Sequence, residues 1–263
     1  SAASDVYKRQ DLEMIPSDLA DFNIYGGLYR YLNLVYLPEV SFEQIRLESS
    51  LSSNLKEGIL KVKTSFYNPE DIRKADVTVS VYDVDRKPVF SKTLEGILPL
   101  GDQLLAEMKI KNPVLWDVDV PQLYTCELTV KTPDQTFTTE ERFGFRHTEF
   151  KDKGPFFLNG KRLLLRGTHR HEDHAGVAQA MTEDMMRREM RMMKDMGVNF
   201  IRLGHYQQSE IILDLCDELG ILVWEEIPWC RGGLGGDVYK KQARRMPVSY
   251  THLRAHETRG NLV

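Results

Sequence analysis

The sequence predicts a multidomain protein in which an antiparallel β region precedes alternating strands and helices. Three observations predict this fold class. Apolar and polar residues alternate with a period of two in short runs across residues 40–147. From residue 148 onward, short apolar runs alternate with longer segments of helical period. Polar side chains gather at the ends of the later strands, where a barrel of parallel strands assembles an active site.

The β region contains four clear strands and the turn residues that separate them. The strands span residues 59–67, 77–84, 123–131 and 137–145, with turn signals at 68–69, 85–88 and 133–134. Several short strands at such intervals within about 100 residues predict an immunoglobulin-like sandwich. Trp116 follows an apolar run and is expected in a corner of the sandwich core.

The region after residue 148 carries the start and stop signals of two helices. Thr182 is a suitable N-cap for the first helix, and Gly197 is suitable to end it. Ser209 and Gly220 bracket the second helix in the same way. Strands that alternate with helices of this length indicate βαβ units and a parallel sheet. Residues 148–246 are therefore expected to form the first three β/α units of a TIM (β/α)8 barrel.

A cluster of polar residues follows the first of these strands, at His169, His171, Glu172, Asp173 and His174. His171 and His174 stand three residues apart, a spacing that would suit a metal site on a helix. A plain surface loop would also account for the cluster. The third reading is an active-site loop that hydrogen-bonds a polar substrate. We favour the third, because two further strand ends carry similar residues.

The second and third strands end in further candidates. Arg202 lies in a strand, where it would either pair with a carboxylate on a neighbouring strand or contact the substrate. His205 follows that strand and is the stronger functional candidate. Glu225 and Glu226 are adjacent, so they face opposite sides of the sheet and cannot act together on one bond. Trp229 is suited either to stacking on a sugar or to packing.

Composition narrows the function classes. The chain has 263 residues and a net charge of −4, which gives no reason to expect nucleic acid or an anionic membrane as a partner. No apolar run approaches the ~18 residues of a membrane span. The three cysteines have no CxxC spacing, so neither a disulfide framework nor a zinc site is expected. Cys216 is expected to be a core thiol.

The two ends of the chain differ in character from the rest. Residues 1–10 and 247–263 resemble translated sequencing adapter, so we give no functional weight to them. Asp237–Met246 begins an amphipathic helix that Pro247 is expected to stop.

Several motifs together resemble glycoside hydrolase family 2. They are FFLNGKRLLLRGTHRHEDH, NFIRLGHYQ and LCDELGILVWEEIP, and the earlier YGGLYRYLNLV resembles the end of that family's jelly-roll sugar-binding domain. The resemblance implies that residues 11–39 are the C-terminal remnant of the jelly roll, with a strand at 31–37. It implies that residues 40–147 are the family's immunoglobulin-like domain and that residues 148–246 are the N-terminal part of its TIM barrel.

The motif details are most similar to β-galactosidases. The resemblance therefore implies a retaining exo-hydrolase that acts on terminal β-D-galactosides, with an oligosaccharide or other β-glycoside as partner. β-Glucuronidase or β-mannosidase activity is the alternative within the family. Outside it, the rival is a non-catalytic carbohydrate-binding module built on the sandwich. The resemblance is compatible with a homo-oligomeric full-length enzyme. The compartment stays open between bacterial cytoplasm and periplasm.

The resemblance also assigns roles to residues. His171 and His205 match histidines that contact substrate hydroxyls, Arg166, Arg202 and Glu226 match positions that support the pocket, and Trp229 joins the substrate-binding set. The family's two catalytic glutamates lie after its fourth and seventh strands, the first in an Asn-Glu motif. This sequence contains no Asn-Glu, so we expect no catalytic residue in it and no hydrolysis by the chain alone. A magnesium-binding glutamate of some members falls near Cys230, so no metal or other cofactor is expected.

Overall fold

The structure is a computed structural model that describes residues 20–229 and 236–253, the last seven of them by backbone only. Two compact units divide the chain. One unit joins the residues up to Leu34 with Leu165–Thr251, and the other contains Val35–Leu164. Each unit is described by itself below. The adapter-like segment at residues 1–10 and the last ten residues lie outside the described part of the chain.

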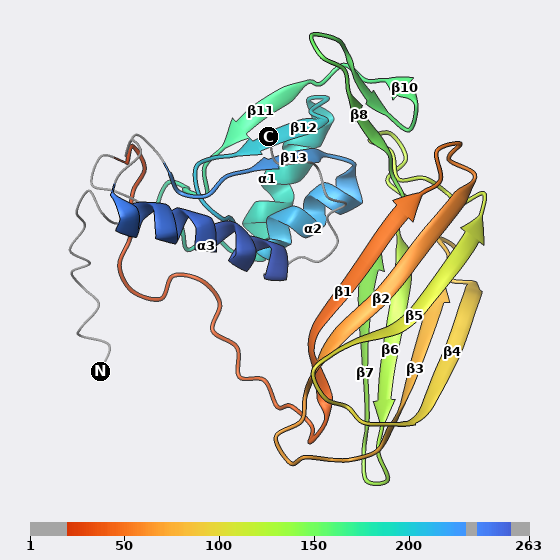
Figure 1. The fold of residues 1–263 in the computed structure, drawn as a ribbon. Coiled ribbons are helices and arrows are strands. Elements are labelled where there is room, and N and C mark those ends of the chain that lie inside the picture. The colour runs from red at the N-terminus through yellow and green to blue at the C-terminus, as the bar shows by residue number, and fades with distance from the viewer. Residues whose placement is uncertain (1–19, 230–235, 254–263) are drawn as a thin grey trace. The chain divides into compact units, whose positions relative to one another are not determined.

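The second unit is a sandwich of seven antiparallel strands in two sheets (Figure 1). One sheet has the order β1-β2-β5, and the other has the order β4-β3-β6-β7. The strands are β1 (Ser41–Leu51), β2 (Glu57–Tyr67), β3 (Ala75–Tyr82), β4 (Pro88–Ile97), β5 (Asp102–Lys111), β6 (Tyr124–Lys131) and β7 (Thr136–Phe143). All four predicted strands are present, and the three-plus-four arrangement confirms the predicted immunoglobulin-like sandwich.

The sandwich core follows from the period of two within each strand. Leu60 and Val62 of β2 are fully buried, and every second residue of β3 is buried in the same way. Gly58 leaves room for the core ring of Phe145, because a Cβ at position 58 would lie 2.7 Å from that ring. Trp116 is 3% exposed, as expected for a core corner. A buried indole offers no face on which a sugar can stack, so Trp116 gives the sandwich no sugar-binding surface.

A small sheet of three strands follows the sandwich. It contains β8 (Thr148–Phe150), β9 (Phe156–Leu158) and β10 (Lys161–Arg162) in the order β10-β9-β8. Asn159 and Gly160 connect β9 to β10 with positive φ angles of 52° and 76°, as a two-residue hairpin turn requires. The Asn159 side chain donates to the carbonyl oxygen of Trp116 at 2.9 Å, which ties the hairpin to the sandwich.

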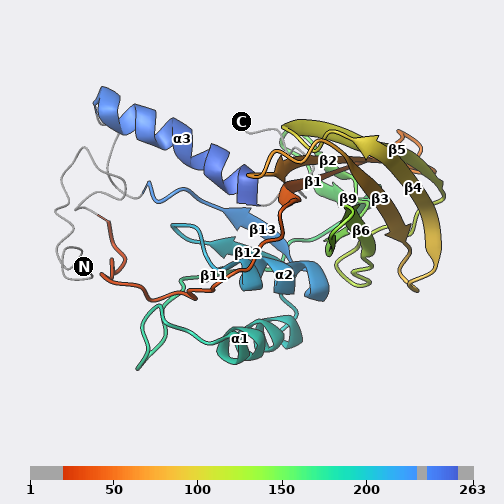
Figure 2. The same ribbon diagram turned by 90° about the horizontal axis from the view of Figure 1, so that it is seen from below.

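The first unit contains three parallel strands in the order β11-β12-β13. They are β11 (Gly167–Arg170), β12 (Phe200–Leu203) and β13 (Leu222–Glu225), followed by α1 (Glu183–Asp195), α2 (Glu210–Leu219) and α3 (Asp237–Leu253), respectively. In Figure 2, α1 and α2 lie on the same side of the sheet. They share an apolar cluster with the sheet that contains Met190, Ile201, Leu203 and Cys216.

The predicted caps form as expected. Thr182 and Ser209 are the N-caps of α1 and α2, and each side chain accepts a backbone N–H from the first turn. Gly197 and Gly220 end the helices with φ angles of 85° and 70°, which glycine adopts without steric cost.

The pleat of β12 separates the two faces of the parallel sheet. Ile201 and Leu203 are fully buried against the helices. The residue between them, Arg202, therefore faces the other side, where it pairs in register with His169 of β11 and Trp224 of β13. This second face carries the functional candidates.

Two sequence-based expectations were wrong. Residues 31–37 were expected to form a strand, but the described residues 20–39 contain no helix or strand. Apolar alternation alone does not make a strand, because the backbone also needs a hydrogen-bonding partner. Pro247 was expected to stop a helix, but α3 continues to Leu253. A proline within a helix removes one hydrogen bond and can kink the helix without ending it.

A helix that crosses a bilayer must be long and predominantly apolar. Among the described residues, no helix combines the length and apolar character needed to cross a bilayer.

Candidate functional site

Three of the predicted residues meet at the carboxyl ends of the parallel strands. His171 follows β11, His205 follows β12 and Glu226 follows β13. The rings of His171 and His205 are 5.2 Å apart between centroids, and Nδ1 of His205 lies 2.7 Å from Oε2 of Glu226. The structure therefore brings together the three residues on which the sequence-based hypothesis depends. Their contact with a substrate stays a prediction.

Arg202 forms the ion pair that the sequence left as one of two alternatives. Its Nε donates to Oε1 of Glu226 at 2.6 Å, and its Nη2 donates to Oε2 at 3.0 Å. The same Nη2 lies 3.1 Å from Nδ1 of His205. We assign the Nδ1 proton of His205 to its hydrogen bond with Glu226, because the carboxylate is the nearer partner and a strong acceptor. This assignment leaves a lone pair on Nε2 of His205.

His169 completes the cluster; the sequence-based reasoning included it in the polar loop but gave it no individual role. Its ring lies 4.9 Å from that of His171 and 5.2 Å from that of His205. Its Nδ1 is 3.3 Å from Nη1 of Arg202. A side chain at Gly204 would overlap the His169 ring, so glycine at that position leaves room for the imidazole. The signal that could have selected His169 is its position beside Arg202 on the neighbouring parallel strand.

The segment before residue 34 also reaches the site. The ring of Phe22 lies 4.9 Å from that of Tyr206 and 6.2 Å from that of His205. Oδ1 of Asp21 is 3.9 Å from Nε2 of His205. Sequence reasoning missed both residues, because nothing local to them indicates a partner about 180 positions along the chain.

Hydrogen bonds and one ion pair hold this segment in place. Asn23 and Tyr25 donate to the Asp173 carboxylate at 2.9 and 3.1 Å. Arg30 lies 3.1 Å from the Glu172 carboxylate. These anchors come from the loop after β11, so the segment and that loop are fixed against each other.

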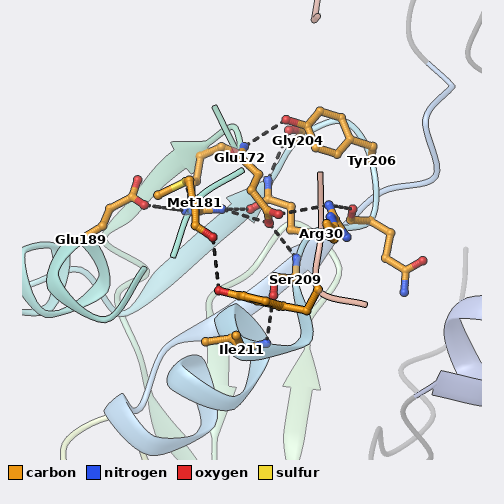
Figure 3. A network of polar contacts seen from close by, with 12 residues as sticks. Arg30, Glu172, Met181, Glu189, Gly204, Tyr206, Ser209 and Ile211 are labelled. Carbon is orange, nitrogen blue, oxygen red and sulfur yellow. Dashed lines mark hydrogen bonds and ion pairs between the residues drawn. The ribbon is translucent and has the colours of Figure 1, made fainter. Parts of the chain in front are cut away.

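A buried polar network connects the loop after β11 to α1 and to the start of α2 (Figure 3). Arg170 and Glu172 are 2% and 0% exposed. Arg170 donates to Glu189 of α1 at 2.9 Å, and Glu172 accepts the backbone N–H of Ser209, at the start of α2, at 2.7 Å. A carboxylate at a helix N-terminus is also stabilised by the helix dipole. The Tyr206 hydroxyl accepts the backbone N–H of Glu172 at 3.0 Å. The network thus fixes the backbone beside His171 and links it to the backbone beside His205.

The electrostatics of the cluster favour a charged Glu226 carboxylate and neutral His169 and His171 imidazoles. Burial alone would raise the pKa of Glu226, but hydrogen bonds from Arg202 and His205 outweigh it and lower that pKa. Burial lowers the pKa of His169, with a further contribution from the positive Arg202. Burial also lowers the pKa of His171, helped by the neighbouring His169 and His205. At neutral pH His169 and His171 therefore present lone pairs.

One alternative that the sequence left open and one expected role are not supported. His174 was a candidate metal ligand with His171, but its Nδ1 lies 2.9 Å from the carbonyl oxygen of Ala175. Within the described ranges, the histidines with mutually close ligand atoms are His169, His171 and His205. The i,i+3 spacing failed because the loop is not helical. Arg166 was expected to support the pocket, but it precedes β11 and donates to the Gly197 carbonyl at 3.0 Å, at the opposite strand end.

Trp229 lies in the loop after β13 and is 49% exposed. Its backbone N–H donates to the Ile227 carbonyl at 2.6 Å. An indole this exposed retains a face for stacking, so its sugar-binding role stays a prediction.

Comparison with known families covers most of the chain. Residues 149–250 match the model described as "Glycosyl hydrolases family 2, TIM barrel domain", and residues 40–146 match "Glycosyl hydrolases family 2". The chain belongs to glycosyl hydrolase family 2. The three parallel strands and the sandwich fall within these two matches.

Three individual relatives show which members of the family this chain is similar to. A crystal structure of a β-glucuronidase from Parabacteroides merdae is 95% identical, with a TM-score of 0.91, over 94% of this chain and 31% of that one. The structure of β-glucuronidase 3 from Bacteroides uniformis is 53% identical, with a TM-score of 0.86, over 94% and 31%. A β-galactosidase from Thermoanaerobacterium thermosulfurigenes is 33% identical over 86% of this chain and 32% of that protein. The chain thus spans about a third of each relative.

These relatives correct the expectation of a β-galactosidase. The motifs that suggested it lie in a region that matches β-glucuronidases and β-galactosidases alike, so they do not separate the two sugars. The higher identities are to β-glucuronidases.

Proposed function

We propose that this chain is part of a β-glucuronidase, a retaining glycoside hydrolase that removes terminal β-D-glucuronic acid from its conjugates. The observation that carries the proposal is the 95% identity to the Parabacteroides merdae β-glucuronidase over 94% of this chain. Among family members, such identity leaves few positions at which the sugar-facing surface can differ. The alternative, a β-galactosidase, rests on the more distant relative.

In this proposal, the cluster forms one wall of the sugar-binding site. Nε2 of His205 accepts a hydrogen bond from a sugar hydroxyl, because its Nδ1 is held by Glu226 at 2.7 Å. His171 contacts a second hydroxyl from the adjacent strand end, and Trp229 stacks on the substrate. Glu226 and Arg202 position His205 and do not react themselves.

The ion pair of Arg202 with Glu226 also limits which substrate groups this wall of the site can recognise. Its guanidinium is paired with both oxygens of Glu226, so its charge is largely compensated before a ligand arrives. We therefore do not assign recognition of the glucuronate carboxylate to Arg202. The described cluster alone suits the hydroxyls that glucuronides and galactosides share.

The bond-breaking step needs two carboxyl groups on either side of the glycosidic bond. One acts as an acid and protonates the leaving oxygen, while the other attacks the anomeric carbon and is later displaced by water. Glu226 does not fit the acid role, because its pKa is lowered and its oxygens are occupied by Arg202 and His205. We assign neither catalytic role to a described residue.

We further propose how the parts of the chain contribute. Residues 40–147 are the immunoglobulin-like domain, and residues 148–246 supply the first three β/α units of the barrel. Residues 11–39 are the end of the jelly-roll domain, whose contribution includes Asp21 and Phe22 beside His205. The contacts of these two residues with the cluster support that role.

The test uses the gene cloned with its flanking sequence, so that any residues on either side are included. Its purified product is assayed with p-nitrophenyl β-D-glucuronide and the matching β-D-galactoside, with the 263-residue chain in parallel. We expect kcat/KM for the glucuronide to exceed that for the galactoside by on the order of 10²-fold or more, and no turnover by the chain alone. Faster cleavage of the galactoside would overturn the assignment.

A further inference from the structure

We propose that the imidazoles of His169, His171 and His205 form a reversible binding site for a divalent transition metal ion, with Zn²⁺ or Cu²⁺ preferred. The family resemblance predicts no resident cofactor, so the ion would come from solution. The proposal does not depend on the glucuronidase assignment, because it uses only the side chains of this cluster.

The geometry of the three rings suits one ion. Each ring offers one nitrogen, and the three nitrogens all lie within 4.8 Å of one another. In a tetrahedral site with Zn–N distances of about 2.1 Å, the nitrogens stand about 3.4 Å apart. Ring rotations therefore need to draw them together by at most about 1.5 Å. His169 is exposed and His171 is partly exposed, so these two rings make the rotations while His205 keeps its hydrogen bond to Glu226.

A second layer of contacts prepares His205 as a ligand. Metal-bound histidines commonly donate their other N–H to a carboxylate, which fixes the tautomer and makes the ligating nitrogen more basic. His205 already has this arrangement, with Nδ1 at 2.7 Å from Oε2 of Glu226. Its Nε2 is then free to bind the ion. Asp21, with Oδ1 at 3.9 Å from that Nε2, is placed to supply a fourth ligand.

The local charges also favour a cation. The carboxylates of Asp21 and Glu226 both lie beside His205, the first 3.9 Å from Nε2 and the second 2.7 Å from Nδ1. Neutral imidazoles are the form that binds metal. Arg202 opposes binding, because its Nη1 is 3.3 Å from Nδ1 of His169. We therefore expect moderate affinity, with a Kd on the order of 10 µM for Zn²⁺.

Calorimetric titration of ZnCl₂ into the tag-free 263-residue chain tests the proposal. We expect about one ion per chain, with affinity lowered at least about tenfold in His169→Ala and in His171→Ala. His174→Ala is the matched control from the same loop and should change the affinity less than about twofold. Glu226→Gln should weaken binding by about 10- to 100-fold, because it removes the carboxylate behind His205.

Two measurements on the unaltered chain keep the test decisive if a variant does not fold. Two-bond ¹H–¹⁵N spectra should show that Zn²⁺ shifts Nε2 rather than Nδ1 of His205. Mg²⁺ should give neither heat nor shifts, since imidazole nitrogen suits transition metals and Mg²⁺ requires oxygen. Equal affinity in the cluster variants and the control, or shifts confined to other histidines, would overturn the proposal.

Discussion

The sandwich and the parallel-sheet unit each bury an apolar cluster, but they differ in the polar side chains that they bury. Among the described residues, the buried polar side chains of the sandwich all carry hydroxyls, namely Ser41, Thr64, Ser65, Thr125 and Thr132. Those in the parallel-sheet unit carry charges or amides, namely Arg170, Glu172, Gln179, Asn199 and Gln208. The sandwich therefore depends on apolar packing, whereas the other unit adds a buried polar network.

The position of that network explains the difference. Glu172 contacts the start of α2 and the segment that carries Arg30, and Arg170 contacts α1. A buried ion pair is weak evidence for stability, because apolar residues of similar volume often serve equally well. We infer that the network is retained for placement: it fixes the loops that carry His171 and His205. Among its described residues, the sandwich carries none of the candidate site residues.

Among the substitutions that distinguish the two units, Glu172→Ala should cause the largest loss of stability. Glu172→Ala leaves Arg170 and the N-terminus of α2 without a buried carboxylate, so we expect about 3–5 kcal/mol of destabilisation. Hydrogen exchange monitored by mass spectrometry should show faster exchange in residues 165–229 and little change in 40–147. The control is Glu140→Ala, which breaks the exposed Arg86 pair in the sandwich and should cost less than about 1 kcal/mol. Equal effects of the two substitutions would contradict the comparison.

The sandwich should respond most strongly to loss of apolar volume. Leu60 is fully buried in β2, so Leu60→Ala should cost about 2–5 kcal/mol and raise exchange in residues 40–147. Leu104 of β5 is 54% exposed, and Leu104→Ala is the matched control, with a cost within about 0.5 kcal/mol. Urea unfolding measures both values. A Leu60 variant as stable as the control would show that the sandwich does not depend on this packing.

Mild acid should destabilise the parallel-sheet unit more than the sandwich. His169 and His171 have lowered pKa values in the folded chain. As pH falls below the unfolded value of about 6.5, the unfolded chain therefore binds protons first, and the free energy of unfolding decreases. The Glu226 contribution is lost only lower, as pH falls below the usual carboxylate range.

The measurement is the urea midpoint at about pH 7.5 and about pH 5.5, followed by exchange in residues 165–229. His171→Gln should reduce the pH dependence of this unit, while His174→Gln serves as the control from the same loop. A pH dependence that is unchanged in His171→Gln would show that this histidine is not responsible.

The smallest expected effect is local to one helix end. Thr182→Ala removes the N-cap of α1, whose hydroxyl accepts the Met185 N–H at 3.4 Å. The bond is long, so the expected loss is near 0.5–1 kcal/mol. Thr182→Ser keeps the hydroxyl and should retain most of the stability. Thermal unfolding compares them, and a loss in the serine variant as large as in the alanine variant would argue against capping.

Local signals predicted much of this structure. The caps at Thr182, Ser209 and Gly220 depend on nearby backbone groups, so their residue types were sufficient. The meeting of His171, His205 and Glu226 followed from their places after successive parallel strands. The period of two in β12 also indicates that the side chains of Arg202 and Leu203 face opposite sides of the sheet.

Distant contacts were not predicted. Asp21 and Phe22 reach His205 from far along the chain, and no local pattern marks them. The strand expected at residues 31–37 failed for a related reason, because its sequence suits a strand but the described part of the chain gives it no pairing partner. The burial of Arg170 could have been predicted from the sequence, since alternation with His169 along β11 places it toward the helices.

The most direct test of the central claim is the kcat/KM of His205→Ala for p-nitrophenyl β-D-glucuronide, measured on the product of the gene cloned with its flanking sequence. We predict a fall on the order of 10²-fold or more relative to the unaltered protein, because the variant loses the imidazole that Glu226 and Arg202 position. His174→Ala, from the same site-side loop region but outside the cluster, should retain activity within about twofold. A His205→Ala variant that remains as active as this control would contradict the assignment of the cluster to sugar binding.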